Sequence, residues 1–141
     1  MTKTVEVINK IAINDPLLIA MVAKASWGAA AIYDDWQEME NKYPCIVITW
    51  STAEGNHWGR RDSLVDFDIF TQGNSGVIAE DIKDRIIELY DQQIFESDES
   101  GPIRMYLGSD FKTPEDTPKI IHWNVQFKAI HWRKSFISQM P

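Results

Sequence analysis

Four features of the sequence have residue types and spacing that could support catalysis or ligand binding. They are two aspartates, two histidines, a glycine turn, and a loop containing arginine and tryptophan. Asp66 and Asp68 stand two positions apart in an alternating run, so a strand places them on one face with backbones about 7 Å apart. The spacing invites comparison with the carboxylate pair of a glycosidase, but such pairs flank a substrate from separate elements. Alternation alone predicts polar residues here, and we expect both aspartates to be exposed.

The remaining candidates for catalysis or ligand binding also favour structural interpretations. His122 and His131 are nine residues apart, so an unbroken strand puts them on opposite faces, where they cannot share a metal.

Residues 73–76 precede a helix, but no lysine follows at phosphate-loop spacing, which favours a turn and helix cap. The single cysteine, Cys45, lies in an apolar run and is expected to be a buried, inert thiol. We therefore expect no catalytic residues, no metal and no cofactor.

Length and composition indicate one globular domain spanning residues 1–141. Hydrophobic residues make up 44% of the chain and charged residues 25%, which are ordinary values for a globular protein. The longest apolar run, Leu17–Val22, is far shorter than the roughly 20 residues of a membrane span. Residues 1–9 do not have the pattern of a signal peptide, so we expect residence in a cytoplasm.

Charge is divided unevenly along the chain. Residues 1–100 hold eight Lys/Arg and eighteen Asp/Glu, whereas residues 101–141 hold six and three, so the balances are -10 and +3 and add to the net charge of -7. The acidic body argues against nucleic-acid binding, which requires clustered Lys/Arg. The basic last quarter could meet the acidic body of a neighbouring copy in a head-to-tail contact. The alternative is a solvated surface without a partner.

Periodicity predicts an α+β fold: a mostly antiparallel sheet with helices packed on one side. The expected elements are a helix carrying Val5, Ile8, Ile11 and Ala12, a helix begun by Asn14-Asp15-Pro16 and broken at Gly28, a short strand in 31–36, strands over Cys45–Trp50 and Leu64–Thr71, a helix burying Ile78, Ile82, Ile86 and Leu89, and strands over Ile103–Leu107 and Ile120–Lys134. The first two long strands are expected to pair. Loops are expected over 34–42, 51–61, 91–102 and 108–118.

The loop over Ser51–Arg61 is longer than the usual two to five residues of a hairpin connection. It contains His57, Trp58, Arg60 and Arg61, a composition typical of protein-interface anchors. One interpretation is that the arginines pair across a subunit boundary with acidic residues of another copy. The candidates are Asp34, Asp35 or the acidic face of the 78–89 helix. The other interpretation is a loop whose tryptophan folds back onto its own sheet.

The order of these elements resembles the tail completion, or tail terminator, proteins of long-tailed bacteriophages and prophages. The matching features are the N-terminal helix pair ending near Gly28, the extended Ile32-Tyr33, the strand Tyr43–Ile48, the strand Phe67–Phe70 with Gly73, and the helix through Leu89. The resemblance implies a ring, usually of six copies, that caps the tail tube and presents a surface to the head connector. It implies a virion protein at the head-proximal end of the tail, assembled in the bacterial cytoplasm. Residues 109–118 match the family pattern least.

Such a ring would let DNA pass without binding it specifically. Acidic residues could line the channel and repel phosphate, and the candidates are Asp91, Glu96, Asp98 and Glu99. Two alternatives remain from the sequence. One is another neck, connector or tail tube protein. The other is a small α+β ligand-binding or enzyme domain, with an apolar pocket lined by some of the six tryptophans.

Overall fold

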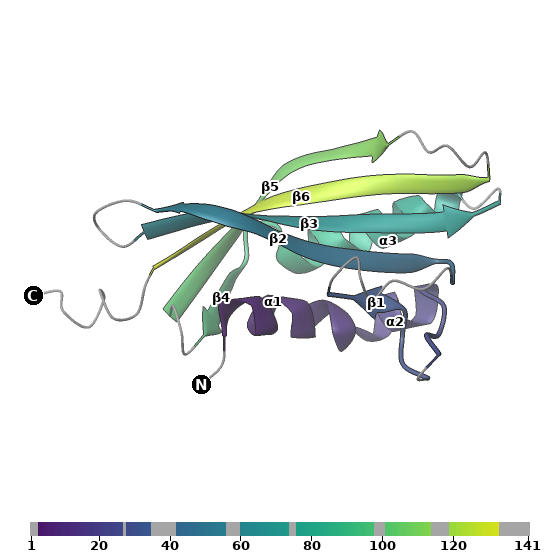
Figure 1. Cartoon of the computed structure of the whole chain (residues 1–141), viewed down its shortest axis with the longest axis horizontal. Helices are drawn as coiled ribbons and strands as arrows, with labels where there is room; N and C mark the ends of the chain where they lie inside the picture. The colour runs from purple at the N-terminus through teal and green to yellow at the C-terminus, as the bar shows by residue number, and fades with distance from the viewer. Residues whose placement is uncertain are drawn as a thin grey trace, which may run out of the picture.

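The structure, a computed structural model, describes residues 3–26, 28–34, 42–55, 60–73, 76–97, 101–113 and 119–132. Within these residues the chain forms three helices and one six-stranded sheet (Figure 1). The elements are α1 (Thr4–Ile13), α2 (Pro16–Met21), β1 (Ile32–Tyr33), β2 (Cys45–Gly55), β3 (Arg60–Gln72), α3 (Gly76–Tyr90), β4 (Ile94–Ser97), β5 (Gly101–Thr113) and β6 (Ile120–Trp132). The predicted α+β class is confirmed.

The strands are ordered β1-β2-β3-β6-β5-β4 across the sheet. β1 is parallel to β2, and every other neighbouring pair is antiparallel. The strands over Cys45–Trp50 and Leu64–Thr71 do pair, with Cys45 opposite Phe70. The sheet is therefore mostly antiparallel, as expected, with a short parallel strand at one edge.

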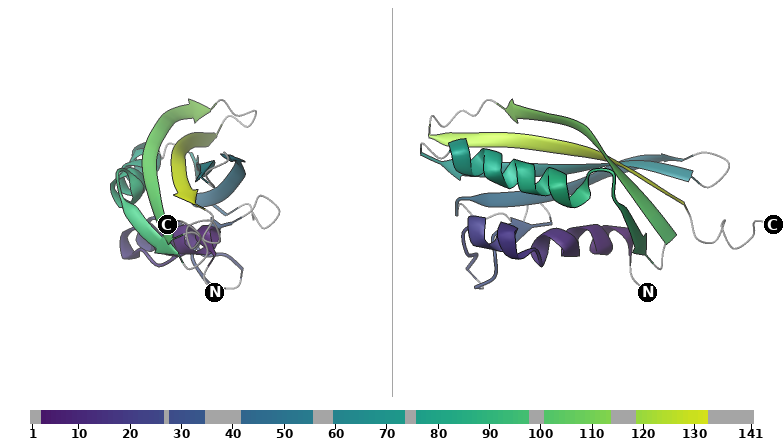
Figure 2. Two further views of the ribbon diagram at one scale, coloured as in Figure 1. Left: turned by 90° about the vertical axis from the view of Figure 1, so that its left-hand side faces the viewer. Right: turned by 180° about the vertical axis from the view of Figure 1, so that it is seen from behind.

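All three described helices pack on one face of the sheet, and Figure 2 shows α1 and α3 from that side in its right-hand view. α3 lies against β3, β5 and β6, while α1 lies against β4. The sheet residues that face the helices are buried and apolar: Ile46, Ile48, Val65, Phe67, Ile69, Ile103, Met105, Val125, Phe127 and Ala129. Among the described helices, none has the length and hydropathy required to cross a bilayer.

The buried face of α3 is rotated from the one that its isoleucine spacing predicts. Its buried residues are Ala79, Ile82, Ile86 and Tyr90. Ile78, expected in the core, is 40% exposed, and Leu89 is only half-buried. The aromatic ring of Tyr90 decides the rotation, because it lies 4.9 Å from the ring of Phe67 and 5.8 Å from that of Phe127. Its hydroxyl also donates to the Ile8 carbonyl at 2.6 Å, which ties α3 to α1.

Asp15 joins α2 to α3. It stands before Pro16 as the predicted N-cap, and its Oδ2 accepts the Leu18 amide at 3.0 Å. The same carboxylate is held by a bidentate contact with Arg85, at 2.7 Å from Nη2 to Oδ1 and 3.0 Å from Nε to Oδ2. These hydrogen bonds from Arg85 hold the pKa of Asp15 below its ordinary value.

α2 is shorter than the sequence predicts. It ends at Met21, well before the expected break at Gly28, because the backbone of Val22 is extended. The next amide, that of Ala23, donates to the Pro44 carbonyl at 2.8 Å instead of continuing the helix. A tertiary hydrogen bond therefore ends the helix where local propensity does not.

A second, smaller apolar cluster lies on the other face of the sheet, at the β1–β2 edge. It contains Ala25, Ala31, Tyr33, Cys45, Val47 and Phe70. Cys45 is a free thiol with no exposed surface, and burial raises its pKa to about 12. The expectation of a buried thiol is therefore confirmed, and the raised pKa disfavours the reactive thiolate at neutral pH.

Three of the expected loops, over 51–61, 91–102 and 108–118, contain strand residues. Residues 51–61 contribute to β2 and β3, which leaves only residues 56–59 between them, outside the described residues. Residues 91–102 contain β4 and the start of β5. β5 also continues through Gly108, which the sequence marks as a turn. The β5–β6 register shifts there by one residue, and a Cβ on Gly108 would lie 3.2 Å from the Gln126 carbonyl oxygen.

Replacing Asp15 with alanine should lower the free energy of unfolding by about 2–3 kcal/mol, because the change removes a helix cap and a charge-assisted pair. Asp15→Asn keeps a capping oxygen and should lose less. Folding lowers the pKa of Asp15. The contribution of Asp15 to the free energy of unfolding is therefore complete above its pKa in the unfolded chain, about 3.9, and is lost as the pH falls through its pKa in the folded protein. Urea unfolding from pH 7 to pH 3 checks this. Equal acid sensitivity in wild type and Asp15→Asn would contradict it.

Candidate assembly surface

The face of the sheet away from the helices carries a hydrogen-bonded row of polar side chains between β3 and β6. His122 Nε2 lies 2.6 Å from Asp68 Oδ1, and the Asn124 amide donates to Asp68 at 3.0 Å. Asn124 and Gln126 also donate to Asp66, at 3.3 and 3.1 Å. The register explains the set, because Asp68 stands opposite Asn124 and Asp66 opposite Gln126. The two aspartates thus share amide donors on one strand.

The expectation that both aspartates are exposed is wrong for Asp68. Its relative exposure is 6%, whereas Asp66 is half-buried. The His122 ring covers one side of this region and stacks on Phe70 with centroids 4.2 Å apart. Buried carboxylates require hydrogen-bond partners, and β6 supplies them. This arrangement specifies the pairing of β3 with β6 on the polar face.

His131 lies on the helix-covered face, so the two histidines are on opposite sides of an unbroken β6, as alternation predicts. His131 Nε2 is 2.9 Å from the hydroxyl oxygen of Ser63, which is buried, and its ring meets Trp50 edge-on at 6.4 Å. A serine beside a histidine is the start of a nucleophile and base arrangement. Burial of Ser63 favours a structural hydrogen bond. Within the described residues, no group of three or more His, Cys, Asp or Glu side chains could hold a metal ion.

Arg60 and Arg61 begin β3, at the end of the sheet far from β1 (Figure 1). Arg60 forms a bidentate contact with Asp62, at 2.9 Å from Nε to Oδ1 and 3.3 Å from Nη2 to Oδ2. Lys128 Nζ lies 3.3 Å from the same carboxylate. The hydrogen bond from Arg60 is the main cause that lowers the pKa of Asp62. The Arg60 charge is thus partly compensated within its own copy.

A hollow of about 320 Å³ opens on the same part of the sheet. Its lining residues are Arg60, Pro102, Arg104, Tyr106, Ile130 and Trp132. Arginine combined with Tyr and Trp is enriched at the buried centres of protein interfaces. The sequence indicates interface character near Arg60, but it does not indicate that β5 and β6 supply the aromatic partners.

The other predicted interface and channel residues are spread over the molecule. Asp34 follows β1 and is exposed, and Glu96 is exposed on the edge strand β4. Asp91 is half-buried and accepts the Leu107 amide at 2.8 Å, so it holds β5 beside the end of α3. The remaining candidates lie outside the described residues: Asp35, His57, Trp58, Asp98 and Glu99.

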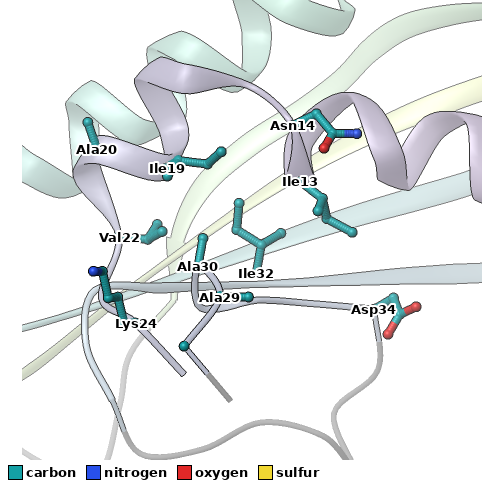
Figure 3. A pocket seen from close by; sticks show the side chains of 11 residues that line it. Ile13, Asn14, Ile19, Ala20, Val22, Lys24, Ala29, Ala30, Ile32 and Asp34 are labelled. Atoms are coloured by element: carbon teal, nitrogen blue, oxygen red, sulfur yellow. The ribbon is translucent and has the colours of Figure 1, made fainter. Parts of the chain in front are cut away.

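An apolar groove of about 810 Å³ lies between α1, α2 and the segment around β1 (Figure 3). Its lining residues are Ile13, Asn14, Ile19, Ala20, Val22, Lys24, Gly28, Ala29, Ala30, Ile32 and Asp34. Ile13 and Ile19 are 39% and 44% exposed, although both are large aliphatic residues. The signal in the sequence for this groove is that these isoleucines lie off the apolar faces of their helices.

Asp68→Ala should lower the free energy of unfolding by about 1–3 kcal/mol, because it removes the acceptor for His122 and Asn124 in a buried setting. Asp66→Ala is the matched control and should cost less, since water can reach the half-buried position. Urea unfolding at pH 7 measures both. Equal losses would contradict the assignment of Asp68 as the centre of the network.

Comparison with known proteins supports a shared fold. No family model and no curated protein matches the chain. Among solved structures, a chain from the virion of a native gene transfer agent particle superposes with a TM-score of 0.71. The match covers 92% of this chain and 94% of that one at 9% sequence identity. This protein therefore has the fold of that virion chain over nearly its whole length.

Proposed function

We propose that this chain is a structural protein of a phage-like virion, and that copies of it form a ring that terminates the tail tube and joins it to the head connector. The observation that carries the proposal is the fold shared with a chain of a gene transfer agent virion. The likeness extends over both chains almost completely, so it concerns the whole domain. The order of elements that resembles tail terminators in the sequence supports the finer assignment.

A closed ring requires two different surfaces on each copy that fit each other. In the strand register, Arg61 stands opposite His131 at one end of the sheet. Asp34 follows Tyr33, and Tyr33 stands opposite Val47 near the other end. Along the strand direction, the register positions of Arg61 and Asp34 are about six residues apart, or roughly 20 Å. An ion pair between the arginine end and Asp34 therefore requires two copies. This geometry supports a head-to-tail contact.

The proposed ring has six copies, with the tail tube protein on one side and the head connector on the other. The virion is its proposed location, at the head-proximal end of the tail, after assembly in the host cytoplasm. DNA would pass through the channel without specific contacts, because a net charge of -7 opposes phosphate binding. Among the acidic candidates, exposed Glu96 on β4 is available to face a channel.

The mass of the purified chain in solution tests the proposal. Six copies of the 16.3 kDa chain give about 98 kDa, and negative-stain images should show rings of uniform size. A mass that rises without limit as concentration increases would instead indicate a tail tube subunit. A chain that stays a monomer at every concentration would overturn ring formation.

Replacing both Arg60 and Arg61 with glutamate should weaken ring assembly on the order of a hundredfold, because like charges would then face each other across the contact. The matched control is Lys112→Glu with Lys119→Glu, which changes two exposed cations outside the proposed contact by the same charge. Light scattering over a concentration series compares the two double variants. Circular dichroism verifies folding, since the change at Arg60 also places a second carboxylate near Asp62. An unchanged oligomer in the arginine variant would exclude this contact.

A further inference from the structure

We propose that the groove between α1, α2 and β1 holds residues 133–141 of a neighbouring copy. The C-terminal segment of each copy would then dock beside β1 of the next. The inference rests on the proposed function in one respect, since both require copies of the chain to assemble. The proposed ring does not specify what binds in this groove, and the present inference names that occupant.

The groove exposes aliphatic surface that needs an apolar partner. Ile13, Ile19 and Ile32 reach it from α1, α2 and β1 (Figure 3). Residues 133–141 read Arg-Lys-Ser-Phe-Ile-Ser-Gln-Met-Pro, and they lie outside the described residues. Their apolar side chains are Phe136, Ile137 and Met140. The segment thus provides apolar side chains that could cover the exposed aliphatic residues of the groove.

The segment begins far from the groove of its own copy. Ile32 pairs with Ile46, whose row continues through Ile69 to Trp123 on β6. From Trp123 to Trp132 is about 30 Å along the strand, and three strand spacings add about 14 Å sideways, so the direct separation is about 33 Å. Figure 1 shows this arrangement, with β6 ending at the opposite end of the sheet from β1 and α2.

The apolar residues of the segment follow Trp132 closely. Phe136 is four residues beyond it and can extend at most about 14 Å, while Ile137 can extend about 18 Å and Met140 about 28 Å. Phe136 and Ile137 therefore fall well short of Ile32 in the same chain, whereas Met140 extends nearly that far. Because the groove and the origin of the segment lie at opposite ends, contact between them joins one copy to the next. Repetition of that contact is the heterologous geometry that a ring requires.

Charge complementarity supports the same occupant. The segment begins with Arg133 and Lys134, and it belongs to the basic last quarter of the chain. Exposed Asp34 lies on the groove, and a second hollow shares Ala20 with it. That second hollow is lined by Asp81, Asp84 and Glu88 together with one cation, Arg85, so its formal charge is acidic. The groove itself has one cation, Lys24, and one anion, Asp34, among its described lining residues, so the acidic charge lies beside the groove and not in it.

Crosslinking between differently labelled copies tests the proposal. Full-length Ala20→Cys and full-length Ser138→Cys are mixed, allowed to assemble and treated with a short bismaleimide. Buried Cys45 contributes little background because its thiol remains protonated. Docking should give a covalent dimer at least about tenfold faster than free encounter, since a docked segment has a high effective concentration. The matched control replaces Ala20→Cys with Ile94→Cys, on β4 at the opposite edge of the sheet, where no enhancement is expected.

The outcomes separate this inference from the proposed ring. Rings that assemble without the Ala20–Ser138 crosslink would overturn the docking and leave the ring intact, and the groove would then belong to another virion protein. A crosslink within single chains of the Ala20→Cys, Ser138→Cys double variant would also overturn it, because the segment would then reach its own groove. Absence of any oligomer would overturn both proposals.

A second pair of variants avoids added cysteines. Ile19→Asp and Phe136→Asp alter the two sides of the contact, and each should weaken assembly by at least about tenfold. Val77→Asp is the matched control, because Val77 is 71% exposed on α3 outside the groove. Thermal unfolding verifies that each variant folds. Normal assembly of either Ile19→Asp or Phe136→Asp would contradict the docking.

Discussion

The pairing of β3 with β6 determines which side of the sheet each central side chain occupies. The ladder runs without a register shift from Arg60 opposite Trp132 to Gln72 opposite Ile120. A slip of one residue would turn Asp66 and Asp68 toward the helices and expose apolar residues such as Phe67. Transfer of two carboxylates into an apolar core without partners is very unfavourable. The register is therefore specified strongly, and the helices, the polar row and both ends of the sheet depend on it.

The two faces of this ladder stabilise it by different interactions. Toward the helices, apolar burial dominates, and Tyr90 adds a hydrogen bond to the Ile8 carbonyl that links two helices. On the other face, buried Asp68 is hydrogen-bonded to His122 and Asn124, which are both supplied by β6. Hydrogen bonds require particular atoms to be opposite each other, whereas apolar contacts tolerate small shifts. The polar face therefore gives the pairing its specificity, and the apolar face provides most of its stability.

Features encoded by neighbouring residues could be predicted from the sequence. The cap at Asp15 and the core face shared by Val65, Phe67 and Ile69 are of this kind, and both are confirmed. Apart from the pairing of β2 with β3, features that depend on distant partners could not be predicted. Arg85 reaches Asp15 across 70 positions, and β4 is a strand of four residues that owes its conformation to pairing with β5. The candidate surfaces are of this second kind, because the hollow beside Arg60 requires Tyr106 and Trp132 from two other strands, and separate elements contribute to the groove.

Charge and geometry together favour a head-to-tail contact between copies over a symmetric one. In an isologous contact the same patch meets itself, so an acidic surface would face an acidic surface. The balance of -10 over residues 1–100 makes such a contact unfavourable for most of the molecule. Cations at the Arg60 end of the sheet, such as Arg104 beside it, relieve this only if they meet the acidic part of another copy. β6 ends at Trp132, at the end of the sheet opposite the groove, so the two proposed contact surfaces lie at opposite ends of each copy. Successive copies joined in this way are related by a constant rotation, and closure of that rotation gives the proposed ring.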